Sequence, residues 1–237
     1  MIIFIKLLLA HLIGDFLLQP DSWVNAKENN KHRSIYLYAH VVLHGLLAWL
    51  LIGEPRFWAY ALLLAVAHGV IDWLKLYFQS EKTQRHWFIA DQLLHLITIG
   101  GIALLGNKID VDRYIIDERA WIYITGIFLL TTPASIIIKK IISIWTPDEN
   151  STKEADLQHA GKYIGILERL FVFFFIVTGN FAATGFLMAA KSIFRFGDLT
   201  QSKDRKLTEY VLIGTLISFG AALATGYLVK FALARLL

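Results

Sequence analysis

The chain of 237 residues alternates between long apolar runs and short polar stretches. A run of about 20 apolar residues is long enough to cross the hydrocarbon core of a bilayer as a helix. The pattern predicts such helices at residues 2–19, 35–53, 57–78, 87–106, 120–145, 161–191 and 210–236. We therefore predict an all-α fold, a polytopic membrane helix bundle with about seven transmembrane helices.

Proline and glycine modify this pattern. Pro133 lies in the middle of the fifth apolar run and predicts a kink there, and Gly179-Asn180 predicts a break in the overlong sixth run. If the sixth run splits, the number of spans becomes eight. Residues 20–34 are rich in Asn, Lys and Asp, and we expect a polar loop. Residues 1–106 are predicted to form a four-helix membrane core and residues 107–237 a C-terminal membrane extension of about three helices, together one structural unit.

The composition supports a membrane protein. Hydrophobic residues make up 56% of the chain and charged residues 18%, and the mean hydropathy is +0.54. Soluble domains have roughly 45–50% apolar and about 25% charged residues. The chain has no cysteine, which excludes disulfides and thiolate metal sites. The net charge is +4, but no stripe of basic residues with interleaved aromatic residues occurs. We therefore expect the lipid bilayer and not nucleic acid as the partner.

Each of the first four apolar runs carries a pair of His or Asp residues four positions apart. The pairs are His11 and Asp15, His40 and His44, His68 and Asp72, and Asp91 and His95. On a helix this spacing places both side chains on one face. The pairs come late in the first and third runs and early in the second and fourth. Because successive helices alternate in direction, we expect all four pairs in the same half of the bilayer.

These residue types in this pattern predict a buried metal site. An ionisable side chain at bilayer depth is costly unless it is paired, hydrated or bound to an ion. Imidazole and carboxylate ligands suit zinc, with manganese and iron as alternatives. Eight ligands would suffice for two ions about 3.5–4 Å apart, as in phosphoester cleavage, or some would orient the others. In a hydrolase, Asp72 or Asp91 would be the catalytic general base.

Three further residues are candidates for substrate contacts. Gln19 and Gln92 lie next to the pairs and are placed to donate hydrogen bonds to a ligand residue or to a substrate. Arg169 is expected on the same side of the membrane, either facing a substrate phosphate or paired with Glu168. We expect Lys75 to extend its ammonium group to the lipid headgroups.

Three functions are compatible with these residues. The first is a metal-dependent hydrolase of a membrane-associated phosphoester such as a lipid phosphate. The second is a transporter of metal ions or protons, in which the same residues form a relay. The third is a non-catalytic assembly or regulatory protein in which the pairs fix helix packing. The excess of Lys and Arg in the loops on the ligand side favours a cytoplasmic position for that side.

The motifs resemble a known family. A-H-L-I-G-D-F-L-L-Q, a loop Lys, A-H-G-V-I-D and D-Q-L-L-H occur in this order within residues 1–105. They resemble a bacterial inner-membrane family known as domain of unknown function 3307, which implies a multi-pass protein of the bacterial inner (cytoplasmic) membrane. The intramembrane His and Asp motifs are also similar, more loosely, to presumed membrane-bound metal-dependent hydrolases. That similarity implies a hydrolase, although the adjacent His-His pairs of the broader group are missing here.

Overall fold

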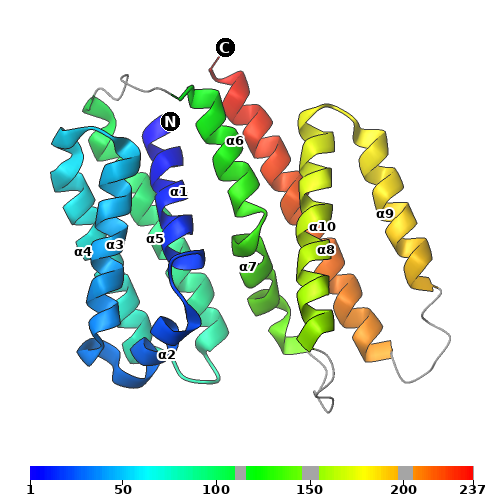
Figure 1. Ribbon diagram of the computed structural model, residues 1–237, viewed down its shortest axis with the longest axis horizontal. Coiled ribbons are helices and arrows are strands. Elements are labelled where there is room, and N and C mark those ends of the chain that lie inside the picture. Colours follow the sequence, from blue (N-terminus) through cyan, green and yellow to red (C-terminus); the bar gives the residue numbers. More distant parts are fainter. Residues whose placement is uncertain (110–115, 146–154, 197–204, 237) are drawn as a thin grey trace. The chain divides into compact units, whose positions relative to one another are not determined.

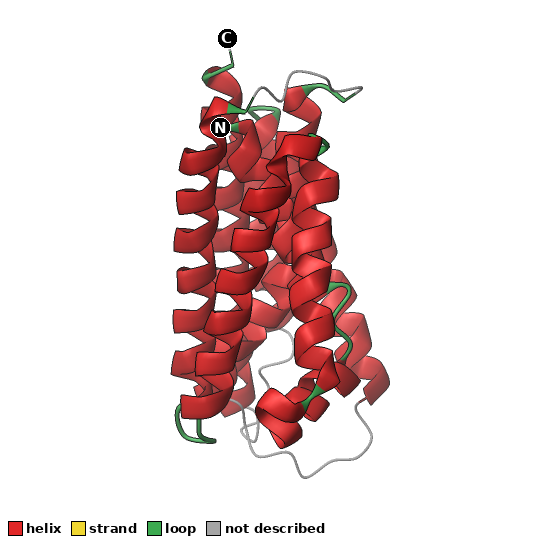
Figure 2. Cartoon of the chain, turned by 90° about the vertical axis from the view of Figure 1, so that its left-hand side faces the viewer, coloured by secondary structure: helices red, strands yellow, loops and turns green. Residues whose placement is uncertain are grey.

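The computed structural model describes residues 1–109, 116–145, 155–196 and 205–236, without the side chains of residues 155–160, 194–196 and 205–208. All regular structure in these residues is helical, as Figure 2 shows, and the predicted all-α fold is confirmed. The helices are α1 (Ile2–Phe16), α2 (Asp21–Asn30), α3 (Ile35–Ile52), α4 (Trp58–Phe78), α5 (Gln84–Leu105), α6 (Glu118–Leu129), α7 (Thr132–Ile142), α8 (Ala155–Val177), α9 (Phe181–Phe196) and α10 (Arg205–Ala234).

The described part of the chain contains several helical stretches that are long and apolar enough to cross a membrane. There are five: Ile35–Ile52, Pro55–Phe78, Gln84–Lys108, Glu118–Trp145 and Glu209–Ala234. The number rises to six if Ile2–Phe16 and Asp21–Arg33, which are bent by 79°, form one broken span. A multi-pass membrane protein is therefore confirmed. The number of about seven spans stays a prediction.

The chain divides into two compact units, Met1–Trp121 and Ile122–Leu237. In the first unit α1 packs against α3 and α5, and α4 packs against α3 and α5 (Figure 1). In the second unit α8 packs against α7, α9 and α10, and α7 also packs against α10. The predicted boundary after residue 106, and the packing of the two parts as one structural unit, stay predictions.

The interior of the first unit has an apolar half. Its buried core consists of Ile3, Leu7, Ala48, Ile52, Phe57, Ala61, Leu64, Ile99 and Ile102. These residues come from the beginnings of α1 and α4 and the ends of α3 and α5, except Phe57, which directly precedes α4. All of these segments lie at the same end of an antiparallel bundle. The other half of each helix therefore closes the bundle with different residues, namely the His and Asp pairs.

The predicted loop at residues 20–34 is wrong, and the first helix is shorter than residues 2–19. Helix α1 ends at Phe16, and the ten-residue α2 begins directly after Pro20. The polar composition hid this helix because α2 has no apolar stripe. Side chains hold α2 in place instead: the ring of Trp23 lies 5.3 Å from that of Tyr36, and Lys27 is buried.

Both predicted interruptions are confirmed. The fifth apolar run is divided between α6 and α7, and Pro133 lies in the first turn of α7, where a missing N–H costs nothing. The sixth run is divided between α8 and α9 at Gly179, which has φ of 81°. Glycine adopts this left-handed conformation without strain, which explains why the break occurs there.

Candidate metal centre

The eight predicted ligand residues face one another inside the first unit. Four helices contribute two residues each: α1, α3, α4 and α5. Seven of the eight residues are buried, and the side chain of Asp15 is 10% exposed. The i, i+4 spacing brings both members of each pair to the bundle axis, and the alternating helix directions bring the four pairs to one level. The predicted convergence is therefore observed.

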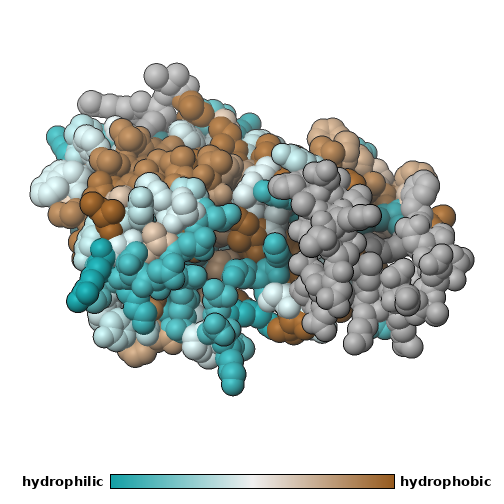
Figure 3. Space-filling model, turned by 60° about the horizontal axis from the view of Figure 1, so that its bottom comes forward, coloured by the Kyte–Doolittle hydropathy of each residue, from teal (hydrophilic) through white to brown (hydrophobic). Residues whose placement is uncertain are grey.

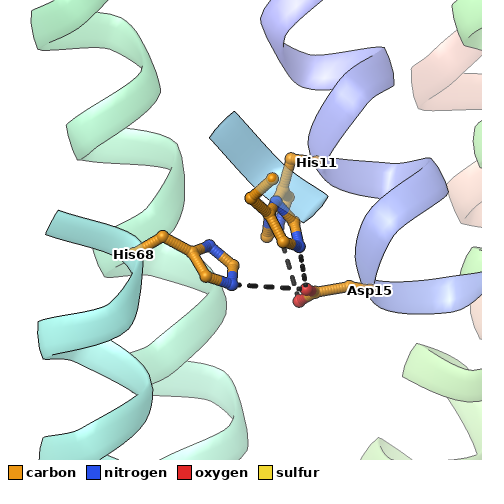
Figure 4. Close-up of side chains that lie close together, drawn as sticks. His11, Asp15 and His68 are labelled. Atoms are coloured by element: carbon orange, nitrogen blue, oxygen red, sulfur yellow. Dashed lines mark ion pairs between the residues drawn. The ribbon is translucent and has the colours of Figure 1, made fainter. Parts of the chain in front are cut away.

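Asp15 is surrounded by imidazoles from three helices. Its Oδ1 atom lies 3.0 Å from Nε2 of His44, 3.2 Å from Nε2 of His40 and 3.7 Å from Nε2 of His68. Its Oδ2 atom lies 3.8 Å from Nε2 of His11. Figure 4 shows the rings of His11 and His68 pointing toward this carboxylate. One carboxylate thus serves as the common neighbour of four imidazoles.

The other two carboxylates share His95. Its Nε2 atom lies 3.5 Å from Oδ1 of Asp72 and 3.4 Å from Oδ1 of Asp91. Asp72 also reaches back toward the first group, because its Oδ2 atom is 3.7 Å from Nε2 of His40 and its Oδ1 atom is 3.8 Å from Nε2 of His68. The five imidazoles and three carboxylates therefore form one continuous cluster.

A small cavity lies among the imidazoles. It has a volume of about 10 Å³ and is lined by His11, His44, Leu64, His68, His95, Thr98 and Ile99. The ring of His68 stacks between those of His44 and His95, with centroid distances of 3.7 and 4.0 Å. A volume of this size is about the smallest that holds one water molecule. The cluster therefore encloses room for a single small ligand.

The donor atoms form three groups that could hold a metal ion, with one ligand atom per residue and all ligand atoms of a group within 4.8 Å of one another. The groups are His11, Asp15, His44 and His68; His40, His68 and Asp72; and Asp72, Asp91 and His95. The first and third groups share no residue, and the second overlaps both. The cluster can therefore provide separate ligands for two ions.

Several of these donor atoms have no hydrogen-bond partner among the described residues. They include both ring nitrogens of His11, Nε2 of His44 and His95, and Oδ1 of Asp15 and Asp91. Nε2 of His44 and Oδ1 of Asp15 are close together without hydrogen-bond geometry. A buried polar atom without a partner costs about 1–3 kcal/mol. Donors that lie close together without bonding to each other are arranged as ligands of a common ion would be.

Two lysines complete the cluster, in roles that the sequence pattern does not predict. Nζ of Lys27, on α2, lies 2.9 Å from Oδ2 of Asp72, and Nζ of Lys75 lies 2.9 Å from Oδ2 of Asp91. The expectation that Lys75 extends to the headgroups is wrong, because a buried carboxylate on the neighbouring helix is a stronger partner. The only signal for Lys27 was its place as the loop lysine between two motifs.

The two glutamine candidates are placed differently. Nε2 of Gln92 donates hydrogen bonds to Oδ2 of Asp15 and of Asp91, both at 3.2 Å, and so ties α5 to α1. Gln19 lies in the turn before α2, and no hydrogen bond described for the cluster includes it. A direct role of either residue in binding substrate stays a prediction.

Arg169 belongs to the second unit, where it is buried at the α6–α7 break. Its Nε donates to the carbonyl of Leu130 at 2.7 Å, and Nη2 donates to the carbonyl of Thr131 at 3.2 Å. The guanidinium also donates to Oγ of Ser135 and Ser218. These bonds satisfy carbonyls that the end of α6 leaves without helical partners. A contact of Arg169 with substrate stays a prediction.

The alternative of a pair between Glu168 and Arg169 is wrong. Glu168 forms its ion pair with Lys191 of α9. Adjacent residues on a helix point in different directions, so two neighbours in sequence do not face each other.

The fold and the site define a class: a multi-span helical protein with buried His/Asp groups able to hold a metal ion. The chain belongs to the family described as protein of unknown function (DUF3307), whose profile matches residues 3–122. The match covers the first unit from residue 3 onward, with all eight cluster residues, and ends one residue past the unit boundary. No curated protein and no solved structure matches the chain.

Proposed function

We propose that the chain is a membrane-embedded, metal-dependent hydrolase of a membrane-associated phosphoester. One observation carries this proposal: two ligand groups without a common residue lie side by side and are connected by a third. Two neighbouring metal ions are the arrangement that phosphatases and nucleases use to cleave phosphoesters. Zinc suits a set of imidazoles and carboxylates without thiolates, and manganese and iron are the alternatives.

The polar contacts favour ion binding over a role in packing alone. Packing pairs would satisfy each other through hydrogen bonds, whereas several donors here have none among the described residues. The ligand atoms also gather at one level of the bundle, and a transport path would need them at successive depths. Bound ions would satisfy the donor atoms that have no hydrogen-bond partner. They would also balance the negative charge that remains because only two of the three carboxylates pair with a lysine.

A divalent ion held by these ligand groups would polarise the phosphoryl group and would lower the pKa of a water molecule, so that the water could attack at neutral pH. Asp72 or Asp91 accepts the proton of that water, because both carboxylates lie in the third ligand group. The water oxygen bonds to phosphorus as the bond from phosphorus to the ester oxygen breaks. The alcohol leaves with one proton, and inorganic phosphate is released.

A lipid phosphate is the substrate class that fits this position. The cluster lies in the half of the first unit next to α2, and hydrophilic side chains gather at this end (Figure 3). A lipid could present its phosphate here while its chains stay in the membrane. We place the protein in the bacterial inner membrane, with the cluster toward the cytoplasm because of the Lys and Arg residues in the loops on that side.

The test is phosphate release from protein in lipid nanodiscs that contain phosphatidic acid or a polyprenyl phosphate. Zinc-loaded wild type is expected to release phosphate, and the chelated protein and a His68→Ala/Asp72→Ala variant are expected to lose this activity. His86→Ala is the matched control, because His86 is an exposed histidine on α5 outside the cluster. Absence of release from protein loaded with zinc, manganese or iron would contradict the hydrolase.

A further inference from the structure

The first and third ligand groups differ in the charges around them. The first group has three imidazoles and one carboxylate, Asp15, and no described lysine lies within ion-pair distance of that carboxylate. The third group has one imidazole and two carboxylates, and an ammonium group lies 2.9 Å from each carboxylate. The two groups are therefore not equivalent sites for a cation.

The lysines oppose an ion in the third group. A divalent ion between Asp72 and Asp91 would compete with both ammonium groups for the same carboxylates, and it would be repelled by both positive charges. Burial strengthens this repulsion because little water screens it. An ion can enter the first group directly, but the third group becomes available only when another partner takes the lysines.

A phosphate monoester has the charge to take both lysines. Its two negative charges match two ammonium groups, and lysine is a common phosphate ligand in proteins. The side chain of Lys75 is 25% exposed, so it is not closed off by the rest of the first unit and leaves room for an anion to approach. Lys27 reaches the cluster from α2, which lies at the foot of the first unit in Figure 1.

Glu28, the residue after Lys27, holds α2 against this end of the bundle. Oε1 of Glu28 accepts hydrogen bonds from Nε2 of Gln79 at 3.4 Å and of Gln84 at 3.2 Å, on either side of the turn between α4 and α5. This attachment keeps Lys27 beside Asp72, even though the two residues are 45 positions apart. The lysine is thus part of the built site and not an accidental neighbour.

We propose that Lys27 and Lys75 bind the phosphate group of the substrate, and that this binding releases Asp72 and Asp91 to a second divalent ion. The inference rests on the proposed function and extends it to the order of binding. The first ion is resident in the histidine-rich group. The second ion enters only together with a phosphate monoester, so the complete two-ion site forms on the substrate.

The test counts bound zinc by mass spectrometry for wild-type protein in phosphatidylcholine nanodiscs, with free zinc kept low by a metal buffer. One arm has no phosphate, one has inorganic phosphate, and one has phosphatidic acid in the nanodisc. We expect one ion without phosphate and two ions with phosphate. If a second zinc ion binds in the presence of inorganic phosphate, free phosphate is sufficient for its binding. If the second ion binds only in the presence of phosphatidic acid, a lipid headgroup is required.

Two ions without phosphate, or one ion in every arm, would overturn the inference and leave the metal centre intact. No ion in any arm would remove the metal centre and the inference together. Coupled loading without phosphate release in the activity assay would contradict only the hydrolase. The wild-type counts decide these cases without any variant.

A Lys27→Met/Lys75→Met variant adds a second test. It is expected to bind two ions without phosphate, because no ammonium group competes for Asp72 and Asp91. Lys82→Met is the control, since Lys82 is exposed in the turn between α4 and α5. If the double variant does not fold, Lys75→Met alone serves, because Lys75 is the more exposed of the two lysines. A phosphate requirement that persists in a folded variant would contradict the role of the lysines.

Discussion

Helices α1, α3, α4 and α5 close the two halves of one bundle with different chemistry. In the apolar half, residues such as Leu7, Ile52 and Phe57 are fully buried against one another. In the polar half, the same helices bury five imidazoles and three carboxylates. Apolar side chains could fill the interior of both halves, because they need no hydrogen-bond or ion-pair partners. Among the described residues, the polar half instead contains donors without a hydrogen-bond partner, which a bound ion would satisfy.

The largest expected difference between the halves concerns Asp15. Asp15→Ala removes the carboxylate that lies near four imidazoles, and we expect zinc affinity to fall more than about 100-fold, the upper end of what loss of an outer partner causes. Competition with a chelating dye measures this affinity. Glu81→Ala, at an exposed acidic residue in the turn before α5, is the control. Unchanged affinity in Asp15→Ala would contradict the ligand assignment.

A substitution in the apolar half should lower the stability of the fold and leave zinc affinity unchanged. Ile52→Ala leaves a cavity at a fully buried position, and we expect a loss of about 2 kcal/mol in stability, the low end for such changes because lipid is as apolar as the core. Zinc affinity should stay unchanged. Leu50→Ala is the control, since Leu50 is 65% exposed and should lose little stability. Loss of zinc in Ile52→Ala would show that the halves are not independent.

Gly14 tests how closely α1 and α3 approach at the cluster. A Cβ atom at position 14 would lie 2.4 Å from Nε2 of His44, so Gly14→Ala must displace that imidazole. We expect zinc affinity to fall about 10–100-fold, as for other changes that misorient a ligand. Gly100→Ala is the matched control, because a Cβ atom there meets nothing within 4 Å. Equal affinities in the two variants would argue against His44 as a ligand.

The smallest effect is expected at Gln92. Gln92→Leu removes the amide that donates to Asp15 and Asp91, so both carboxylates lose an orienting hydrogen bond. We expect about 10-fold weaker zinc binding by dye competition, at the low end for outer partners. Leu93→Ala, at an exposed neighbouring position, should bind zinc like wild type. A Gln92→Leu variant with wild-type affinity would show that these hydrogen bonds do not position the ligands.

The sequence predicted the parts of the site that depend on helix geometry alone. The four-residue spacing placed each pair, such as His68 and Asp72, on one face, and alternating directions placed the four pairs at one level. Both arguments need only the period of the helix and the order of the spans. They do not need to know which helix packs against which.

The parts that depend on contacts between helices were missed. Lys27 is in a polar segment without apolar periodicity, and its partner Asp72 lies far away in sequence. Lys75 is three residues from Asp72, but its partner is Asp91 on the next helix, which only the register of α4 against α5 reveals. Pro133 indicated the break between α6 and α7. No sequence pattern indicated that Arg169 donates hydrogen bonds to the backbone carbonyls at this break.

The metal content of detergent-purified protein tests the central claim most directly. Mass spectrometry would compare the wild type with the His68→Ala/Asp72→Ala variant. We predict stoichiometric zinc, manganese or iron in the wild type and its loss in the variant. A folded wild type that stays metal-free after reloading with each ion would contradict the metal centre.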